Sequence, residues 1–283
     1  MSMDLDETFS SIDLVSQCLT DERRTAKFQE AIERAVRPGD TVLDSGTGSG
    51  ILALMAARAG AKKVVAVEYD PFVAKIAMQN VAQNGYADVV HIVLGDIRDS
   101  NFSEGTKFDV VIMEMLTTGM IDEFQVWAMN NLHAKGYVGP ETRFVPQSQR
   151  TYLAPAYADF SNYGFNLRMV RHIWEPYASI DKKLLADSVL ISSIPFDSIA
   201  PLESETKTEF TAVEDGIVNS VYLTSISVLH DEIEVGDTAA LNAPVIFPLK
   251  EDLTVRKGDI IEISVNYRFG GGFRNFHADA RIL

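Results

Sequence analysis

The chain has 283 residues, of which 46% are hydrophobic, so it is long enough for two domains with buried cores. Its net charge of −15 argues against a nucleic-acid backbone as the main partner, because phosphate binding needs clustered Lys and Arg. We therefore expect basic peptides or amines, and no nucleic acid, as partners.

The cysteine content and the absence of long apolar runs indicate the cellular compartment in which the protein is expected. The single cysteine, Cys18, allows no internal disulfide and favours a reducing cytoplasm. The acidic segment Met1–Glu7 does not resemble a signal peptide, and no apolar run reaches membrane-spanning length. We expect a soluble, cytoplasmic protein without membrane contact. Its five histidines have no metal-ligand spacing, so we expect no metal.

The first predicted element is an amphipathic helix over residues 20–37. Thr20 is expected to be its N-cap, and Pro38-Gly39 ends it. The apolar run Thr41-Val42-Leu43 then predicts a buried strand, which is followed by a glycine-rich turn and an apolar helix. Such a strand, turn and helix are typical of a nucleotide-binding unit.

The turn itself, Asp44-Ser45-Gly46-Thr47-Gly48-Ser49-Gly50, indicates the cofactor. The glycines Gly46, Gly48 and Gly50 permit positive φ and close approach of the backbone to a ligand. Their spacing is not that of the dinucleotide fingerprint, and Asp44 would repel a pyrophosphate. S-adenosylmethionine (SAM) has no phosphate and carries an ammonium that Asp44 can attract, directly or through water. The turn therefore predicts a SAM-dependent methyltransferase.

Two further acids follow the next two predicted strands. The run from Ala61 ends in Glu68, where a ribose diol would need a bidentate acceptor. The strand from Val89 to Leu94 leads to Asp96 and Ile97, where an acid can accept from the adenine amino group. Any one acid could instead cap a helix or lie in solvent. Because three acids follow three successive strands, we expect all of them at one SAM-binding crevice.

Strand-like and helix-like segments alternate through the first half of the chain. Helices are predicted at 51–59 and 72–84, and a strand at 108–114 precedes a helical stretch that ends near Leu132. This alternation predicts an α/β fold with a doubly wound, mainly parallel sheet. From Phe144 onwards, β-branched and aromatic runs separated by turns predict a mostly antiparallel β-barrel. We expect a SAM-binding domain at 1–146 and a barrel domain at 147–283.

Two glutamates, Glu114 and Glu123, bracket the loop that follows the fourth strand. In this order of motifs the chain resembles the protein arginine methyltransferase family, whose double-glutamate loop has its acids nine positions apart. The segment Asp21-Glu22-Arg23-Arg24-Thr25 is similar to the family's helix whose arginine binds the SAM carboxylate, which points to Arg24. Pro146 matches a proline at the family's domain junction that is often cis. The resemblance implies that Glu114 and Glu123 are catalytic.

The resemblance also implies a homodimer. Tyr163-Gly164-Phe165 and Glu175-Pro176 are similar to parts of the family's dimerisation arm, and Asp252-Leu253-Thr254-Val255 is similar to a late barrel strand.

Electrostatics gives the glutamate pair a physical reason. SAM is a sulfonium cation and guanidinium is permanently charged, so bringing the two together in a poorly solvated site needs about two negative charges. Glu114 and Glu123 would supply these charges and would orient a guanidinium nitrogen through charge-assisted hydrogen bonds. The alternative for Glu123 is a solvated residue on a helix.

Departures from the family pattern leave the acceptor open. Met115-Leu116-Thr117-Thr118 replaces the aromatic residues that follow the first glutamate, and Ala240-Leu241-Asn242 stands where the family has a Thr-His-Trp loop. The N-terminal aromatic motif is reduced to Phe9. The favoured acceptor is a protein or peptide arginine or another cationic nitrogen. A methyltransferase for a different peptide residue or a small amine, and a non-catalytic, SAM-binding dimeric scaffold, are the alternatives.

Overall fold

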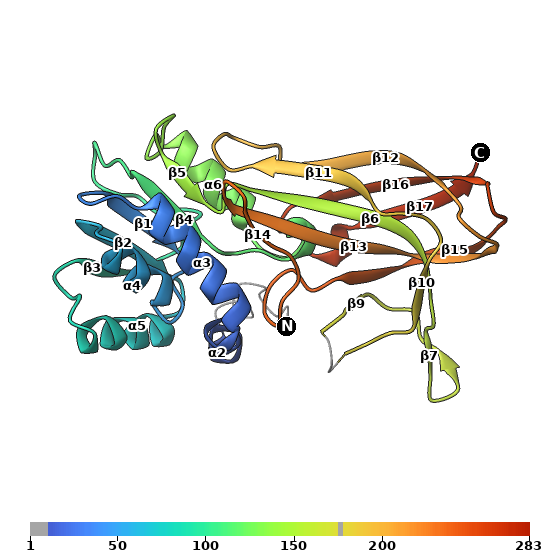
Figure 1. Cartoon of the computed structure of the whole chain (residues 1–283), viewed down its shortest axis with the longest axis horizontal. Helices are drawn as coiled ribbons and strands as arrows, with labels where there is room; N and C mark the ends of the chain where they lie inside the picture. Colours follow the sequence, from blue (N-terminus) through green and yellow to red (C-terminus); the bar gives the residue numbers. More distant parts are fainter. Residues whose placement is uncertain (1–10, 175–177) are drawn as a thin grey trace.

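The computed structural model describes residues 11–174 and 178–283 (Figure 1). Phe9 and the predicted arm segment Glu175-Pro176 lie outside these ranges. Two helices come first, α2 (Ile12–Thr20) and α3 (Glu22–Ala35), and they precede the first sheet. In the described part of the chain, no helix combines the length and the apolar character needed to cross a membrane.

The first half of the chain forms a five-stranded parallel sheet with the strand order β3-β2-β1-β4-β5. Helices pack against it, so the predicted α/β fold is confirmed. The strands are β1 (Thr41–Ser45), β2 (Lys63–Glu68), β3 (Val90–Leu94), β4 (Val110–Met113) and β5 (Arg143–Val145). The helices between them are α4 (Ile51–Arg58), α5 (Pro71–Gln83), η1 (Thr118–Met120) and α6 (Gln125–Ala134).

The sheet positions the predicted site because its strands end at a common edge. In the registers of β1 with β2 and β4, Asp44 lies beside Ala66 and Ile112. The carboxyl ends of β1, β2 and β4 therefore meet, and ligands of open parallel sheets bind at this edge. The helix after β2 begins as predicted, since the Asp70 side chain accepts from the backbone of Phe72 and Val73.

The second half is built of antiparallel strands, as predicted (Figure 1). The larger sheet contains β6 (Ser148–Ala158), β9 (Arg171–His172), β10 (Lys182–Leu184), β11 (Val189–Pro195), β13 (Gly216–His230), β14 (Ile233–Val235) and β15 (Val245–Val255). A smaller sheet contains β12 (Glu203–Thr211), β16 (Ile260–Arg268) and β17 (His277–Ile282), and β7 (Ser161–Asn162) pairs with β8 (Phe165–Asn166). A short helix, η2 (Phe273–Asn275), precedes β17. Closure into a barrel and a domain boundary at 146 stay predictions.

The start of α3 differs from the sequence prediction and ties the two halves together. Thr20 ends α2, and the N-cap of α3 is Asp21, whose carboxylate accepts from the Arg24 backbone at 3.0 Å. The prediction of Thr20 as N-cap was wrong because a separate helix precedes α3. Asp21 also accepts from the Ala240 backbone at 2.8 Å and from the Thr238 hydroxyl. This buried carboxylate therefore joins the first helices to the loop before β15.

A glycine loop of the second half holds the segment between β4 and α6. The backbone of Gly270 donates to the Met120 carbonyl at 3.0 Å, and Gly272 donates to the Ile121 carbonyl at 2.9 Å. Gly270 has φ of +68°, and a Cβ atom there would lie 2.8 Å from the Phe124 ring. Only glycine combines this backbone conformation with so close an approach.

Replacing Gly270 with Ala is expected to lower the free energy of unfolding by roughly 2–4 kcal/mol, because the added methyl group combines backbone strain with overpacking against Phe124. Gly105→Ala is the matched control, since Gly105 has φ of +80° and open space around it. Urea unfolding followed by circular dichroism measures both variants. Equal losses in the two variants would show that the contact with Phe124 adds nothing.

Candidate functional site

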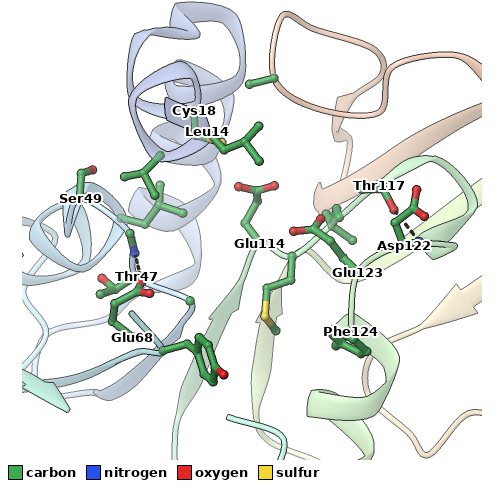
Figure 2. Close-up of a pocket in the computed structure, with 18 of the residues that line it drawn as sticks. Leu14, Cys18, Thr47, Ser49, Glu68, Glu114, Thr117, Asp122, Glu123 and Phe124 are labelled. Carbon is green, nitrogen blue, oxygen red and sulfur yellow. Dashed lines mark hydrogen bonds between the residues drawn. The ribbon is translucent and has the colours of Figure 1, made fainter. Parts of the chain in front are cut away.

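A cleft of about 350 Å³ lies at the carboxyl edge of the parallel sheet (Figure 2). Its walls come from both halves of the chain. The first half contributes α2, the glycine turn, the ends of β2 and β3 and the loop between β4 and α6. The second half contributes β9 and its next residues, together with the loop 240–243. Of the ten predicted site residues, eight line the cleft: Arg24, Gly46, Gly48, Glu68, Asp96, Ile97, Glu114 and Glu123.

The glycine turn and Glu68 form one end of the cleft. Glu68 ends β2 and is buried, and its Oε2 accepts from the Gly48 backbone at 2.8 Å while its Oε1 accepts from the Asp70 backbone at 3.0 Å. A carboxylate has about four lone-pair sites, so Glu68 can still accept from a ligand hydroxyl. Burial raises the pKa of Glu68, and the backbone donors Asp70, Gly48 and Tyr69 act against this rise. Bidentate binding of a ribose by Glu68 stays a prediction.

The predicted residues Asp44 and Gly50 are absent from the described lining of the cleft. Asp44 is buried at the end of β1, and its carboxylate accepts from the Thr47 hydroxyl at 2.6 Å. Thr47 itself faces the cleft. Burial raises the pKa of Asp44 to about 7, so its negative charge is partial at neutral pH. Gly50 is the N-cap of α4 and packs against Ala77. A cofactor contact by either residue stays a prediction.

Asp96 lines the cleft but is already bonded. Its two carboxylate oxygens accept from the Arg98 guanidinium and from the Arg98 backbone at 2.5–3.0 Å. Arg98 also lies over the Phe124 ring, with its guanidinium carbon 4.2 Å from the ring centroid. An adenine amino group would therefore compete with Arg98 for Asp96. Ile97 beside it is buried and faces the same cleft.

Arg24 and Glu114 form a buried ion pair beneath α2. Arg24 comes from α3, Glu114 follows β4, and their side chains are 4% and 9% exposed. The Arg24 Nη1 also donates to the Cys18 carbonyl at 3.2 Å, and its Nε is buried without a partner among the described residues. Burial raises the pKa of Glu114, although Arg24 acts against this rise. A buried guanidinium with an unused donor can accept a further anion.

Glu123 shares the cleft with Glu114, and Figure 2 shows both carboxyl groups directed into it. Glu123 has no hydrogen bond or ion pair to any residue in the described ranges. Burial raises the pKa of Glu123 well above its ordinary value, and the charges of Glu114 and Asp122 raise it further. Burial also raises the pKa of Asp122 to about 6. Three largely buried acids therefore line one cleft, with Arg24 paired to Glu114, and together they form a site that favours a cation.

Other lining residues carry no prediction from the sequence. Leu14, Val15 and Cys18 of α2 cover the cleft, and burial raises the pKa of Cys18 to about 12, so its thiol is unreactive. His172 and Trp174 enter from the second half. Their alternation with the buried Ile173 is a strand pattern that could have placed both side chains on one face, but it could not have shown which cleft they line.

Comparisons with known proteins agree with this fold. The sequence model of the family described as Ribosomal protein L11 methyltransferase (PrmA) matches residues 23–141. The structure is similar to Trypanosoma brucei PRMT1, solved as an enzyme-prozyme heterotetrameric complex with AdoHcy, with a TM-score of 0.76 and 17% identity over 98% of this chain and 99% of that chain. The ribosomal protein arginine N-methyltransferase rmt3 of Schizosaccharomyces pombe is 33% identical over 172 residues, which are 57% of this chain and 31% of that protein.

These findings define a methyltransferase with the fold of the protein arginine methyltransferases. An uncharacterized protein of Methanocaldococcus jannaschii, MJ1452, is 34% identical over 253 residues, which are 89% of this chain and 91% of that protein. The chain belongs to the same family as MJ1452.

Replacing Glu123 with Gln is expected to stabilise the ligand-free enzyme at pH 8. The unfolded chain ionises Glu123 near the ordinary pKa of 4.5, whereas the folded chain resists ionisation. Stability that is present below that pKa is therefore lost as the pH rises toward the higher pKa of the folded state, by about 1.4 kcal/mol for each unit of difference. Glutamine has no charge to bury.

Urea unfolding of wild type and variant at pH 5 and pH 8 tests this expectation, with the exposed Glu104→Gln as control. The variant's advantage should be larger at pH 8. An advantage that is equal at both pH values would mean that Glu123 ionises normally in the folded chain.

Proposed function

We propose that this enzyme transfers the methyl group of SAM to a guanidinium nitrogen of an arginine side chain in a protein or peptide. The observation that carries the proposal is the pair Glu114 and Glu123, two buried carboxyl groups directed into one cleft (Figure 2). An acceptor without positive charge would leave this concentration of acids uncompensated.

The residues at the glycine end of the cleft fit SAM. Glu68 has lone pairs available for the ribose hydroxyls, and the buried Arg24 has an Nε donor without a partner among the described residues for the SAM carboxylate. Gly46, Gly48 and Thr47 line the space between them. SAM supplies an electrophilic methyl group on a sulfonium. Asp44, Gly50, Asp96 and Ile97 complete the proposed cofactor site, Asp44 acting through Thr47.

The remaining part of the cleft would hold the acceptor. Glu114 and Glu123 would each accept N–H hydrogen bonds from the guanidinium and direct one nitrogen toward the methyl group. Their negative charge would offset the repulsion between the sulfonium and the guanidinium in this poorly solvated space. Because Arg24 pairs with Glu114 in this structure, contact between Arg24 and the SAM carboxylate would leave Glu114 free for the acceptor.

The relatives support this proposal without deciding the acceptor. A ribosomal protein arginine N-methyltransferase is similar to this chain over 57% of its length. The L11 methyltransferase model matches only residues 23–141, which exclude His172, Trp174 and the loop 240–243 of the cleft. A methyltransferase for a different peptide residue or a small amine is therefore the second candidate. A SAM-binding scaffold without acceptor chemistry is the third.

Glu114→Gln is expected to lower turnover by roughly 100-fold or more while it leaves SAM affinity mostly intact, because the lost charge acts on the acceptor and on the transition state. The enzyme is incubated with methyl-labelled SAM and a lysate rich in basic proteins. Complete hydrolysis then identifies the labelled amino acid. Labelled methylarginine that is lost in the variant is the expected result.

The exposed Glu104→Gln serves as the control for this experiment and should retain full turnover. Label in another amino acid or a small molecule would replace arginine as the acceptor and favour the second candidate. SAM binding without any label would favour the scaffold.

We further propose a cytoplasmic homodimer, with the hairpin of β7 and β8 as its contact. This hairpin extends from the larger sheet (Figure 1) and exposes Tyr163 and Phe165, and Met169 is exposed just after it; their exposed fractions are 97%, 68% and 61%. Clustered apolar side chains of this kind mark an interaction surface. The described residues contain one cysteine, which fits a reducing compartment.

Phe165→Glu is expected to convert the dimer into a monomer, because it places a charge in an apolar interface. Sedimentation equilibrium measures the mass of wild type and variant. Ile199→Glu, which changes a side chain that is 63% exposed elsewhere in the second half, should leave the dimer intact. A wild type that sediments as a monomer would contradict the proposed dimer.

A further inference from the structure

The acid-lined part of the cleft has an aromatic wall that comes from the second half of the chain. His172 and Trp174 both line the cleft, and their rings stack with centroids 6.1 Å apart and an interplanar angle of 22°. The His172 Nε2 lies 3.6 Å from the Asp122 carboxylate, and Asp122 precedes Glu123. Figure 2 shows Asp122 and Glu123 on the side of the cleft opposite Glu68 and Thr47. The wall therefore belongs to the acceptor end.

Backbone hydrogen bonds and packing fix this wall. His172 pairs with Val245 of β15, and the Ile173 backbone donates to the Pro244 carbonyl at 2.7 Å. Trp174 exchanges backbone hydrogen bonds with Ala178 at 3.1 and 2.8 Å. The Phe273 ring packs edge-on against His172 with centroids 5.5 Å apart. Both rings are thus held before any acceptor enters.

The loop before β15 lies beside the wall, since Pro244 accepts from the Ile173 backbone. Ala240, Asn242 and Ala243 of this loop line the cleft with small or short side chains. This loop contains neither histidine nor tryptophan. One of each enters the cleft from residues 172–174, a different element.

We propose that His172 and Trp174 form the binding wall of the acceptor subsite and select a planar cation, the guanidinium of arginine. This inference rests on the proposed function. The face of an indole ring attracts cations, and a guanidinium can lie flat against it while its edge donates to Glu123 and Asp122. A lysine ammonium is compact and strongly hydrated, so it gains less from a flat wall. Burial lowers the pKa of His172, so its neutral ring adds no charge that would repel the acceptor.

Calorimetric titration of the full chain, saturated with S-adenosylhomocysteine, tests whether His172 and Trp174 bind the acceptor. The two titrants are a glycine-rich peptide with one arginine and the same peptide with lysine in its place. Wild type should bind the arginine peptide more tightly. Trp174→Leu should weaken binding of the arginine peptide by roughly 3- to 30-fold and reduce the preference for arginine, whereas Trp174→Phe, which keeps an aromatic face, should recover most of the affinity.

His172 is proposed as a positioning residue for Trp174. His172→Ala should weaken binding of the arginine peptide, and His172→Phe, which preserves the stacked ring, should restore it. In turnover assays the affected variants should raise KM for the peptide more than they lower kcat. Affinity for S-adenosylhomocysteine should be unchanged in all four variants, which separates loss of the wall from general misfolding.

The outcomes distinguish this proposal from the proposed function. In one outcome, wild type binds and methylates the arginine peptide while Trp174→Leu binds that peptide with unchanged affinity. This result would contradict the proposed role of the wall but not the arginine acceptor. If Trp174→Leu and Trp174→Phe weaken binding of S-adenosylhomocysteine and of the peptide equally, Trp174 is structural and the wall is overturned. If wild type neither binds nor methylates the arginine peptide, the proposed function and the wall both fail.

Discussion

The dominant constraint on this structure is the clustering of acidic side chains around the buried ion pair of Arg24 and Glu114. Glu114, Glu123 and Asp122 lie at one cleft, and Arg24 forms an ion pair with Glu114 alone. Burial raises the pKa values of all three acids, and the charges of Glu114 and Asp122 raise that of Glu123 further, so the ligand-free protein is in a state that a bound cation would stabilise. A cationic acceptor that binds here would gain binding energy from the acids at the place where the methyl group would be transferred.

Such a site keeps its geometry only if the loop that carries the acids is held from outside. The second half does this through the main chain and through buried polar side chains. Ser225 accepts from the Gly119 backbone at 2.9 Å, Thr118 donates to the Ala243 carbonyl at 2.7 Å, and Gln149 donates to the Thr117 carbonyl at 2.9 Å. With the contacts of Gly270 and Gly272, these bonds fix the loop between β4 and α6 before any ligand binds.

The sequence predicted the parallel sheet, the cofactor turn and the acids that face the cleft, because strand ends and glycine turns are local patterns. It predicted that Asp44 attracts the cofactor directly or through water; in the fold Asp44 is buried and bonded to Thr47, which lines the cleft. It could not show that Asp96 accepts from Arg98, that His172 lies beside Asp122, or that Trp174 lines the same cleft. Contacts of this kind depend on pairing between segments that are distant in the sequence, such as β9 with β15. Local sequence patterns do not predict such pairing.

Under the proposed function, the two halves of the chain bind different ligands of the cleft. The residues proposed to bind SAM lie within residues 23–141, which match the methyltransferase family model, while His172 and Trp174 lie outside that range. Changes in β9 would therefore alter the acceptor subsite and leave the proposed cofactor residues in place. A lineage of such enzymes could then change its substrate by mutation in the second half, while the residues that bind the cofactor stay the same.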